Sequence, residues 1–322
     1  MPQVRVQMAT GMNPPTIIST FAGCGGSSLG YKLAGFKELL AVEWDQNAVD
    51  TFHLNFPDVP IYHGDICKLT SSECMKLAGI SSGELDVLDG SPPCQGFSMA
   101  GKRKFDDLRN SLFREFARLL KELQPRVFVM ENVTGMIKGY MKQAYLTIMA
   151  ELRACGYQCK GEVLNAMYYN VPQSRERVII IGVRNDLGIQ PSHPKPQTRP
   201  ITVKQAFRGI TGSGDAPVLT PRYQAYWHHA KQGETVGKQR SVVKLKLSGV
   251  ALTLQKSNEN GPPYHPTECR AISTLERKRI SSFPDSFKCI DRNSAIKCIG
   301  NSVPPNLMRA IAEHIRKELL HD

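Results

Sequence analysis

Short runs of apolar, mostly β-branched residues recur through the first 184 residues, and several of them are separated by segments of helical periodicity. One such segment, 111–123, places its leucine and phenylalanine side chains on one helical face and ends before Pro125. Strands that alternate with helices favour a mostly parallel sheet, because a parallel connection needs a crossover. We therefore predict an α/β fold with strands near 16–20, 39–42, 85–88, 127–130 and 178–183.

The character of the sequence changes after Arg184, where four prolines precede a stretch rich in glycine, lysine and arginine. Residues 201–255 contain eight Lys or Arg and two acids, a net charge that is half of the chain's formal +12. The helical pattern of 307–320 suits packing back onto the first domain. We expect a large domain from 1–184 and 296–322, and a small basic domain from 185–295.

A glycine-rich turn at 21–26 follows the first predicted strand and precedes a helix. Such a turn lets a ligand approach the main chain, although similar turns also occur at purely structural sites. Glu43 ends the second strand, where a carboxylate can accept from ribose hydroxyls, and Trp44 can stack on adenine. Asp65 and Ile66 provide a third site, for the adenine amino group and ring. This order indicates an adenosine-containing cofactor, either a nicotinamide dinucleotide or S-adenosylmethionine.

Cys94 follows two prolines in a loop at the carboxyl end of a predicted strand, a place that catalytic residues favour. Glu131 ends the next strand and puts a carboxyl group at the same edge, while Arg175 and Arg177 immediately precede another strand. A buried structural thiol, a helix cap and solvated arginines are the alternative interpretations of these residues. The nine cysteines show no zinc-finger spacing, so we predict no metal.

These segments, in this order, closely resemble the motifs of the C5-cytosine methyltransferase family. The resemblance covers nearly the whole chain except the basic stretch after Arg184, and 270–284 is similar to the family's ninth motif. The sequence departs from the family pattern at Ile272-Ser273, where Leu-Thr is more usual, and at Ser281, where Gln is common. The matching segments are 21–26, 91–95, 131–133, 173–177, 270–284 and 300–305.

The resemblance implies a Rossmann-like, S-adenosylmethionine-dependent domain, a small target-recognition domain, and methyl transfer to C5 of cytosine, with S-adenosylhomocysteine as product. It implies that the Cys94 thiolate attacks C6 of the base, that Glu131 acts at N3, and that Arg175 and Arg177 hold the O2 edge. It also carries over the cofactor-binding residues, which are Phe21, Gly23, Gly25, Gly26, Glu43, Trp44, Asp65, Ile66, Pro93, Leu112, Asn301 and Val303.

The resemblance and the basic charge together imply duplex DNA as partner, with the target cytosine flipped out of the stack. The 95–108 loop is glycine-containing and basic, which suits closure over DNA. A tRNA-directed relative, a silent DNA-binding relative and a nicotinamide oxidoreductase are the three alternatives. The basic insert weighs against a tRNA-directed relative, and the intact Cys94 and Glu131 weigh against a silent relative. A nicotinamide oxidoreductase would leave Arg175 without a role. We expect DNA contacts from Gln95, Ser98, Lys102, Arg103, Arg222, Lys238, Arg240 and Lys244.

The N-terminal residues lack a charged start followed by an apolar core, and no stretch approaches roughly 18 uninterrupted apolar residues. We therefore expect a cytoplasmic protein that associates with the nucleoid by binding DNA, without membrane contact. We also expect a monomer from a restriction–modification system, for which a cognate restriction endonuclease is a candidate partner.

Overall fold

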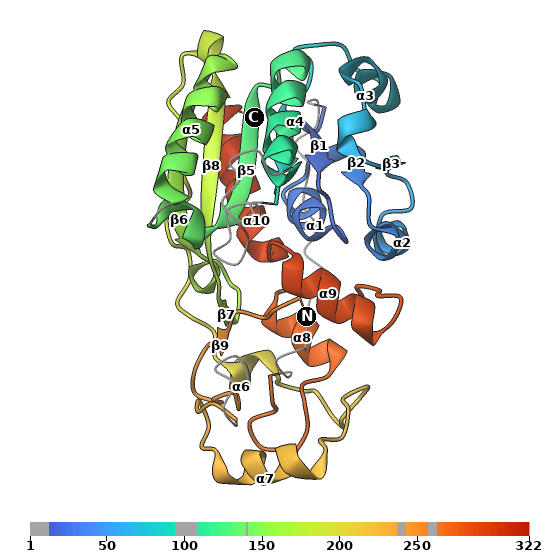
Figure 1. Cartoon of the computed structure of the whole chain (residues 1–322), viewed down its shortest axis with the longest axis vertical. Coiled ribbons are helices and arrows are strands. Elements are labelled where there is room, and N and C mark those ends of the chain that lie inside the picture. The colour runs from blue at the N-terminus through green and yellow to red at the C-terminus, as the bar shows by residue number, and fades with distance from the viewer. Residues whose placement is uncertain (1–12, 94–107, 140, 237–242, 257–262, 322) are drawn as a thin grey trace.

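The computed structural model describes residues 13–93, 108–139, 141–236, 243–256 and 263–321, without the side chains of 108–111. A seven-stranded sheet fills the upper part of the molecule (Figure 1), with the strand order β3-β2-β1-β4-β5-β8-β6. Strands β3, β2, β1, β4 and β5 run parallel to one another, and β8 runs antiparallel to β5 and β6. This mostly parallel sheet with its covering helices confirms the predicted α/β fold.

The strands of this sheet are β1 (Thr16–Thr20), β2 (Lys37–Glu43), β3 (Ile61–His63), β4 (Val87–Gly90), β5 (Val127–Val133), β6 (Tyr157–Asn165) and β8 (Glu176–Arg184). Five of them match the predicted apolar runs to within a few residues. The two others, β3 and β6, were not among the predicted strands. Both lie at the edges of the sheet, where side chains are only partly buried, so their sequences lack a continuous apolar run.

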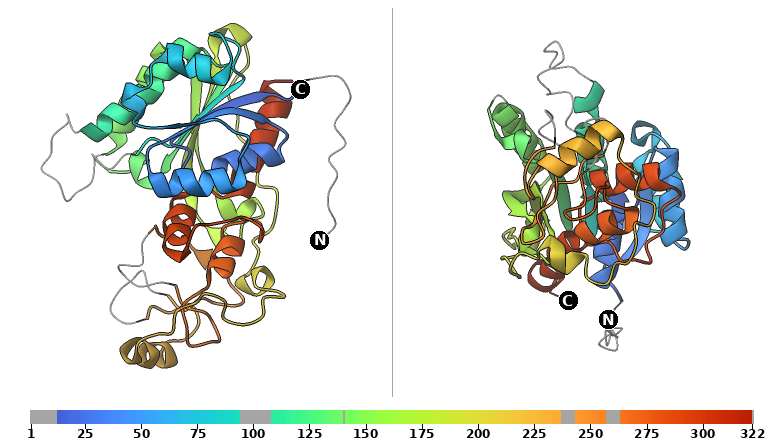
Figure 2. Two further views of the ribbon diagram at one scale, coloured as in Figure 1. Left: turned by 90° about the vertical axis from the view of Figure 1, so that its right-hand side faces the viewer. Right: turned by 90° about the horizontal axis from the view of Figure 1, so that it is seen from below.

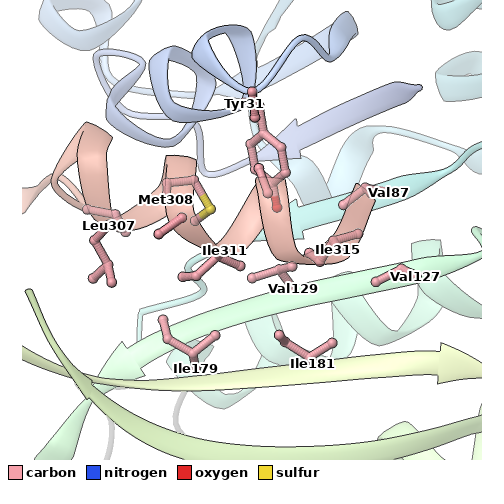
Figure 3. Packing of buried hydrophobic residues seen from close by; sticks show 14 of the residues in the cluster. Tyr31, Val87, Val127, Val129, Ile179, Ile181, Leu307, Met308, Ile311 and Ile315 are labelled. Carbon is pink, nitrogen blue, oxygen red and sulfur yellow. The ribbon is translucent and has the colours of Figure 1, made fainter. Parts of the chain in front are cut away.

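The helices of this part are α1 (Gly26–Leu33), α2 (Gln46–Asn55), α3 (Ser71–Ala78), α4 (Leu108–Leu123), α5 (Met141–Ala154) and α10 (Pro305–His314). Successive residues of each strand point to opposite faces of the sheet, and each face has its own hydrophobic core. Val129 and Ile181 face α1 and α10 (Figure 3), whereas Phe128 and Ile180 face α3, α4 and α5. The side view in Figure 2 shows α10 across the sheet from α4 and α5. Both faces of the sheet are therefore covered, as its apolar strands require.

Residues 203–280 form a second part, which we call the small lobe, below the sheet in Figure 1. Its elements are α6 (Val203–Ala206), α7 (Pro221–His229), β9 (Ala251–Leu252) and α8 (Thr274–Ile280). Two compact apolar clusters lie within it, one around Ile272 and Leu254 and the other around Trp227 and Tyr264. Isolated bridges and loops dominate between these elements, and main-chain hydrogen bonds between the loops join them.

The chain returns to the sheet before the expected boundary at 295/296. Phe283 and Phe287 already pack with Phe52 and Cys24, together with residues of α9 (Arg292–Asn301). Helix α9 lies between the sheet and the small lobe in Figure 1. This packing favours a boundary just before Phe283, while the domain limits themselves stay a prediction.

Candidate active site

The carboxyl ends of the parallel strands and the start of β8 meet at the edge of the sheet that faces the small lobe (Figure 1). Ligand sites favour this edge in open α/β sheets, because loops there diverge from neighbouring strands. Cofactor candidates follow β1, β2 and β3, and catalytic candidates follow β4 and β5 or precede β8. The sites predicted separately along the sequence therefore fall into two adjacent halves of one edge.

The glycine turn after β1 has an unusual main chain. Phe21, Gly23 and Gly25 all have positive φ angles, of 54°, 58° and 92°. A Cβ at Gly25 would come within 2.3 Å of a ring carbon of Phe56, whereas a Cβ at Gly23 would meet nothing within 4 Å. The turn is thus packed on one side and open on the other, and α1 begins immediately after it with free N–H groups.

Glu43 is buried at the end of β2, and its carboxylate is held by main-chain donors. Gly23 N–H donates to Oε2 at 2.8 Å, and the N–H groups of Trp44 and Asp45 donate to Oε1 at 2.9 Å. Trp44 is 77% exposed beside it. A fixed carboxylate next to an exposed aromatic face, above an open glycine turn, suits an adenosine with its ribose hydroxyls.

The other predicted cofactor residues lie around this turn. Asp65 accepts the N–H of Cys67 at 3.0 Å and begins the short helix 66–68, in which Ile66 is buried. Val303 packs so close that a Cβ on Gly26 would lie 2.6 Å from its carbonyl oxygen. Pro93 and Asn301 are exposed, and Leu112 is half-buried against the α4 core.

The catalytic half contains a close ion pair. Arg177 Nε lies 2.8 Å from Glu131 Oε1, and both side chains are nearly buried. Asn132 follows Glu131 on β5 and donates from Nδ2 to the Pro92 carbonyl at 2.9 Å. Asn132, which the sequence analysis did not single out, thereby ties the loop that leads to Cys94 to the strand that carries Glu131. Cys94 itself lies outside the described residues.

We expected Arg175 to hold the O2 edge of the base together with Arg177, and in the structure two of its donor groups have main-chain partners. Its side chain is 2% exposed, and its Nη1 donates to the Leu254 carbonyl at 3.2 Å. Its Nη2 donates to the carbonyls of Gly300 and Asn301 at 3.0 and 3.1 Å. Burial, and to a smaller degree the charge of Arg177, lowers the pKa of Arg175 to about 9, so it keeps its charge at pH 7. Its Nη1 and Nη2 groups thus hold main chain, and the ion pair at the edge is Arg177 and Glu131.

Asp89 is a buried acid of this region that the sequence analysis did not single out. It lies on β4, next to Val129 in the sheet register, and accepts from the Tyr31 hydroxyl at 3.4 Å. Burial, followed by the charges of Glu38 and Glu131, raises the pKa of Asp89 to about 8. The catalytic half therefore contains a second carboxyl group, which is protonated at neutral pH.

The predicted DNA contacts are only partly within the described residues. Gln95, Ser98, Lys102, Arg103, Lys238 and Arg240 lie outside them. Arg222 is exposed on α7, with its guanidinium 5.7 Å from the Tyr226 ring centre. Lys244 is buried, donates from Nζ to the carbonyls of Trp227 and Ala230 at 3.1 and 3.0 Å, and lies 3.6 Å from the Trp227 ring centre. Its ammonium group therefore holds the small lobe together, because it faces inward.

Two further observations concern the described residues alone. They contain no group of three or more His, Cys, Asp or Glu side chains arranged to hold a metal ion. Their helices include none that is long and apolar enough to cross a membrane.

Comparison with known proteins matches residues 15–317 to the C-5 cytosine-specific DNA methylase family. A relative from Neisseria gonorrhoeae, Type II methyltransferase M.NgoPII, is 35% identical, and the match covers 96% of this chain and 98% of the relative. Type II methyltransferase M.XorII from Xanthomonas oryzae pv. oryzae is 32% identical, over 96% of this chain and 86% of the relative.

Solved structures share the whole architecture. A structure described as a candidate DNA modification methyltransferase encoded within an E. coli prophage has a TM-score of 0.83 and 27% identity, and covers 96% of this chain and 100% of that one. The Spodoptera frugiperda DNMT2 structure has a TM-score of 0.70 at 19% identity, covers 95% of this chain and 99% of that one, and supports the fold alone. The family match, the relatives and the arrangement of the edge agree: this chain belongs to the C-5 cytosine-specific DNA methylase family.

Proposed function

We propose that the chain transfers a methyl group from S-adenosylmethionine to C5 of a flipped-out cytosine in duplex DNA, through a covalent bond between Cys94 and C6. The observation that carries this proposal is the Glu131–Arg177 pair at the end of β5, with Asn132 holding Pro92 of the loop before Cys94. A nucleophile loop and an oriented carboxyl group at one edge are what attack on C6 with a proton at N3 requires.

The cofactor half fits S-adenosylmethionine. Glu43 would accept from the ribose hydroxyls, Trp44 and Ile66 would enclose adenine, and Asp65 would accept from its amino group. The open side of the turn at Gly23 leaves room for the methionine end. When bound, the cofactor supplies the methyl group as an electrophile, a reaction that needs no metal.

In this mechanism Cys94 adds to C6 as a thiolate, and the electron pair of the C5–C6 double bond makes C5 nucleophilic. Glu131 holds a proton at N3, where the negative charge accumulates, and Arg177 fixes Glu131 through Oε1. After methylation, loss of the C5 proton restores the double bond and expels the Cys94 thiolate. Arg175 acts on this site only through the main chain that it holds.

Duplex DNA is proposed to bind between the large and small lobes, because both the 95–108 loop and the small lobe are basic. Flipping the cytosine costs a few kcal/mol, which protein–DNA contacts must offset. We propose Gln95, Ser98, Lys102, Arg103, Arg222, Lys238 and Arg240 for these contacts and give Lys244 a structural role. We also propose that the chain acts as a monomer and is paired with a restriction endonuclease, because its relatives carry Type II methyltransferase names.

The first test offers radiolabelled S-adenosylmethionine with unmethylated plasmid DNA or with total tRNA. We expect label in DNA, at C5 of cytosine, and none in tRNA. Label confined to tRNA would instead support the tRNA-directed alternative. If the folded protein transfers label to neither nucleic acid, the proposal that it is a methyltransferase is wrong.

A second test traps the covalent bond on DNA that contains 5-fluorocytosine, because fluorine at C5 blocks the final proton loss. We expect a denaturation-resistant complex from the unmodified chain and none from Cys94→Ala. Cys155→Ala is the matched control, since this half-buried thiol lies on the far face of the sheet with the α4 and α5 core. Trapping by Cys94→Ala would show that the nucleophile is misassigned.

A further inference from the structure

The tripeptide Gln173-Ser174-Arg175 connects the two lobes at the start of β8. Its first two residues form β7 (Gln173–Ser174), which pairs in parallel with β9 of the small lobe. We infer that Gln173 and Arg175 form a clamp that couples cofactor binding to DNA binding, so that each ligand tightens the other. This inference rests on the proposed function and assigns Gln173 and Arg175 as positioning residues for it.

The clamp holds both main-chain polar groups of one small-lobe residue, Leu254. Gln173 Oε1 accepts the N–H of Leu254 at 3.2 Å, and Arg175 Nη1 donates to the Leu254 carbonyl at 3.2 Å. Gln173 Nε2 also donates to Ser281 Oγ at 3.0 Å, at the end of α8. Two side chains from one strand start therefore hold both polar groups of Leu254.

The same arginine holds the cofactor side. Its Nη2 bonds the carbonyls of Gly300 and Asn301, the last two residues of α9. The next residue, Ser302, lies with its Oγ 3.3 Å from Cys24 Sγ in the glycine turn, and Val303 contacts Gly26. One guanidinium thus connects Leu254 of the small lobe with the end of α9, and the next two residues of the chain contact the turn proposed to hold the cofactor.

The two chain segments joined by Arg175 also touch each other directly. A Cβ on Gly300 would lie 2.3 Å from the Gln255 carbonyl oxygen, so α9 and the main chain just after Leu254 are in close contact there. Gln255 and Lys256, which follow the clamped Leu254, are exposed and available to a polyanion. A shift of residues 254–256 on DNA binding would therefore be transmitted to Gly300 and onward to the turn.

The chemistry of Arg175 argues against a purely stabilising role. A buried cation is costly, and well-packed apolar side chains often replace buried charges with no loss of stability. Among the described residues no carboxylate pairs with Arg175, whose bonds all go to main-chain carbonyls. Its planar guanidinium group can donate to three carbonyls in fixed directions. The single ammonium group of lysine cannot reproduce this geometry.

The test measures the affinity of S-adenosylhomocysteine with and without a duplex that the chain methylates, and the affinity of that duplex with and without S-adenosylhomocysteine. We expect the unmodified chain to show one coupling factor in both directions, on the order of 5–150-fold. In Arg175→Lys the factor should fall to within about 2-fold of unity. A merely structural change would weaken both affinities and leave their ratio intact.

Arg279→Lys is the matched control, because Arg279 also donates to two main-chain carbonyls, those of Ala206 and Arg208, but within the small lobe. It should keep the coupling factor of the unmodified chain. If Arg175→Lys does not fold, Gln173→Ala and Ser281→Ala remove the other arm of the clamp and should each lower the factor by several-fold.

Three outcomes separate the clamp from the proposed function. Full coupling retained in folded Arg175→Lys, or in Gln173→Ala when the first variant does not fold, would overturn the clamp. A chain that methylates DNA but shows no coupling would also overturn it and leave the proposed function intact. A chain that binds neither ligand would overturn the proposed function, and the clamp with it.

Discussion

The cofactor half and the catalytic half of the same sheet edge are built by different means. In the cofactor half, Glu43 accepts three main-chain N–H groups, the most distant of them 20 residues away at Gly23. In the catalytic half, Asn132 reaches Pro92 across 40 residues and Arg175 reaches Gly300 across 125. The donors that hold Glu43 all come from the turn after β1 and the end of β2, whereas the contacts of Arg175 form only when the small lobe and α9 are in place.

The two halves also differ in electrostatics. Glu43 is surrounded by main-chain donors, which stabilise a carboxylate without a partner cation. The catalytic half contains several charged groups that are buried close together. Arg175 and Arg177 repel each other, and the charge of Glu131 contributes to the raised pKa of Asp89. Changes in the cofactor half should therefore act on binding, and changes in the catalytic half on rate and on pH dependence.

The largest expected effect comes from breaking the catalytic half at Glu131. Glu131→Gln should lower kcat by roughly 10²–10⁴, because the proton at N3 is lost as a catalytic element. Affinity for S-adenosylhomocysteine should stay within about 3-fold, since Glu43 is untouched. Glu162→Gln is the matched control, because Glu162 faces the same β8 residue, Ile179, from the other side. An equal loss of cofactor affinity would contradict the separation of the halves.

Two glycine replacements probe the cofactor turn itself. Gly25→Ala combines a positive φ with a Cβ 2.3 Å from Phe56, so it should lower the free energy of unfolding by about 2–4 kcal/mol. Gly23→Ala has only the unfavourable φ and should cost about 1–2 kcal/mol. Urea unfolding without cofactor measures both. Equal losses would mean that Phe56 moves aside and that the turn is less rigid than its packing indicates.

Glu43→Gln tests whether the cofactor half acts on binding alone. The amide must place a donor against at least one main-chain N–H, and it loses the charge that strengthens hydrogen bonds to ribose. Affinity for S-adenosylhomocysteine, measured by calorimetry, should fall about 10–100-fold, with kcat at saturation within about 3-fold. Asp45→Asn, at the neighbouring helix cap, should change that affinity by less than about 3-fold. A fall in kcat as large as the fall in affinity would count against this division.

Per pH unit, the smallest expected effect is a pH dependence of stability from Asp89. The folded chain keeps the Asp89 proton to about pH 8, whereas the unfolded chain loses it near pH 4, so unfolding releases a proton between these values. The free energy of unfolding should therefore decrease with rising pH in this window, by at most about 1.4 kcal/mol per unit. Asp89→Asn should gain stability relative to the unmodified chain from pH 5 to 8. Parallel urea stability curves across this range would refute the assigned proton.

The contrast between the halves also explains what could be predicted from sequence. The turn at 21–26, Glu43 and Glu131 lie at the ends of strands that their own apolar runs predict, so local sequence positions them. Arg175 and Lys244 were assigned by residue type, but their directions depend on Leu254 and Trp227, which are distant in sequence or held by tertiary packing. The hydrophobic periodicity of the sequence does not reveal such partners.

Asp89 and the edge strand β6 escaped prediction for related reasons. A single acid within an apolar strand gives no signal of its own, since its protonation depends on Glu38 and Glu131 in the folded chain. β6 is only partly buried, so its sequence lacks the continuous apolar run that predicts a strand. The return of the chain at Phe283 likewise depends on partners near Phe52 and Cys24 that local sequence does not reveal.

The position of α10 near the end of the described chain has a consequence for biosynthesis. One face of the sheet, including Val129 and Ile181, is covered by α1 and by residues 303–320. At about 5–20 residues per second, the ribosome delivers those residues many seconds after β1, β4 and β5. Until then this apolar face is open to solvent and to chaperones. A growing chain would thus possess most strands of the sheet long before it had a finished interior, and premature termination before α10 would release an aggregation-prone product.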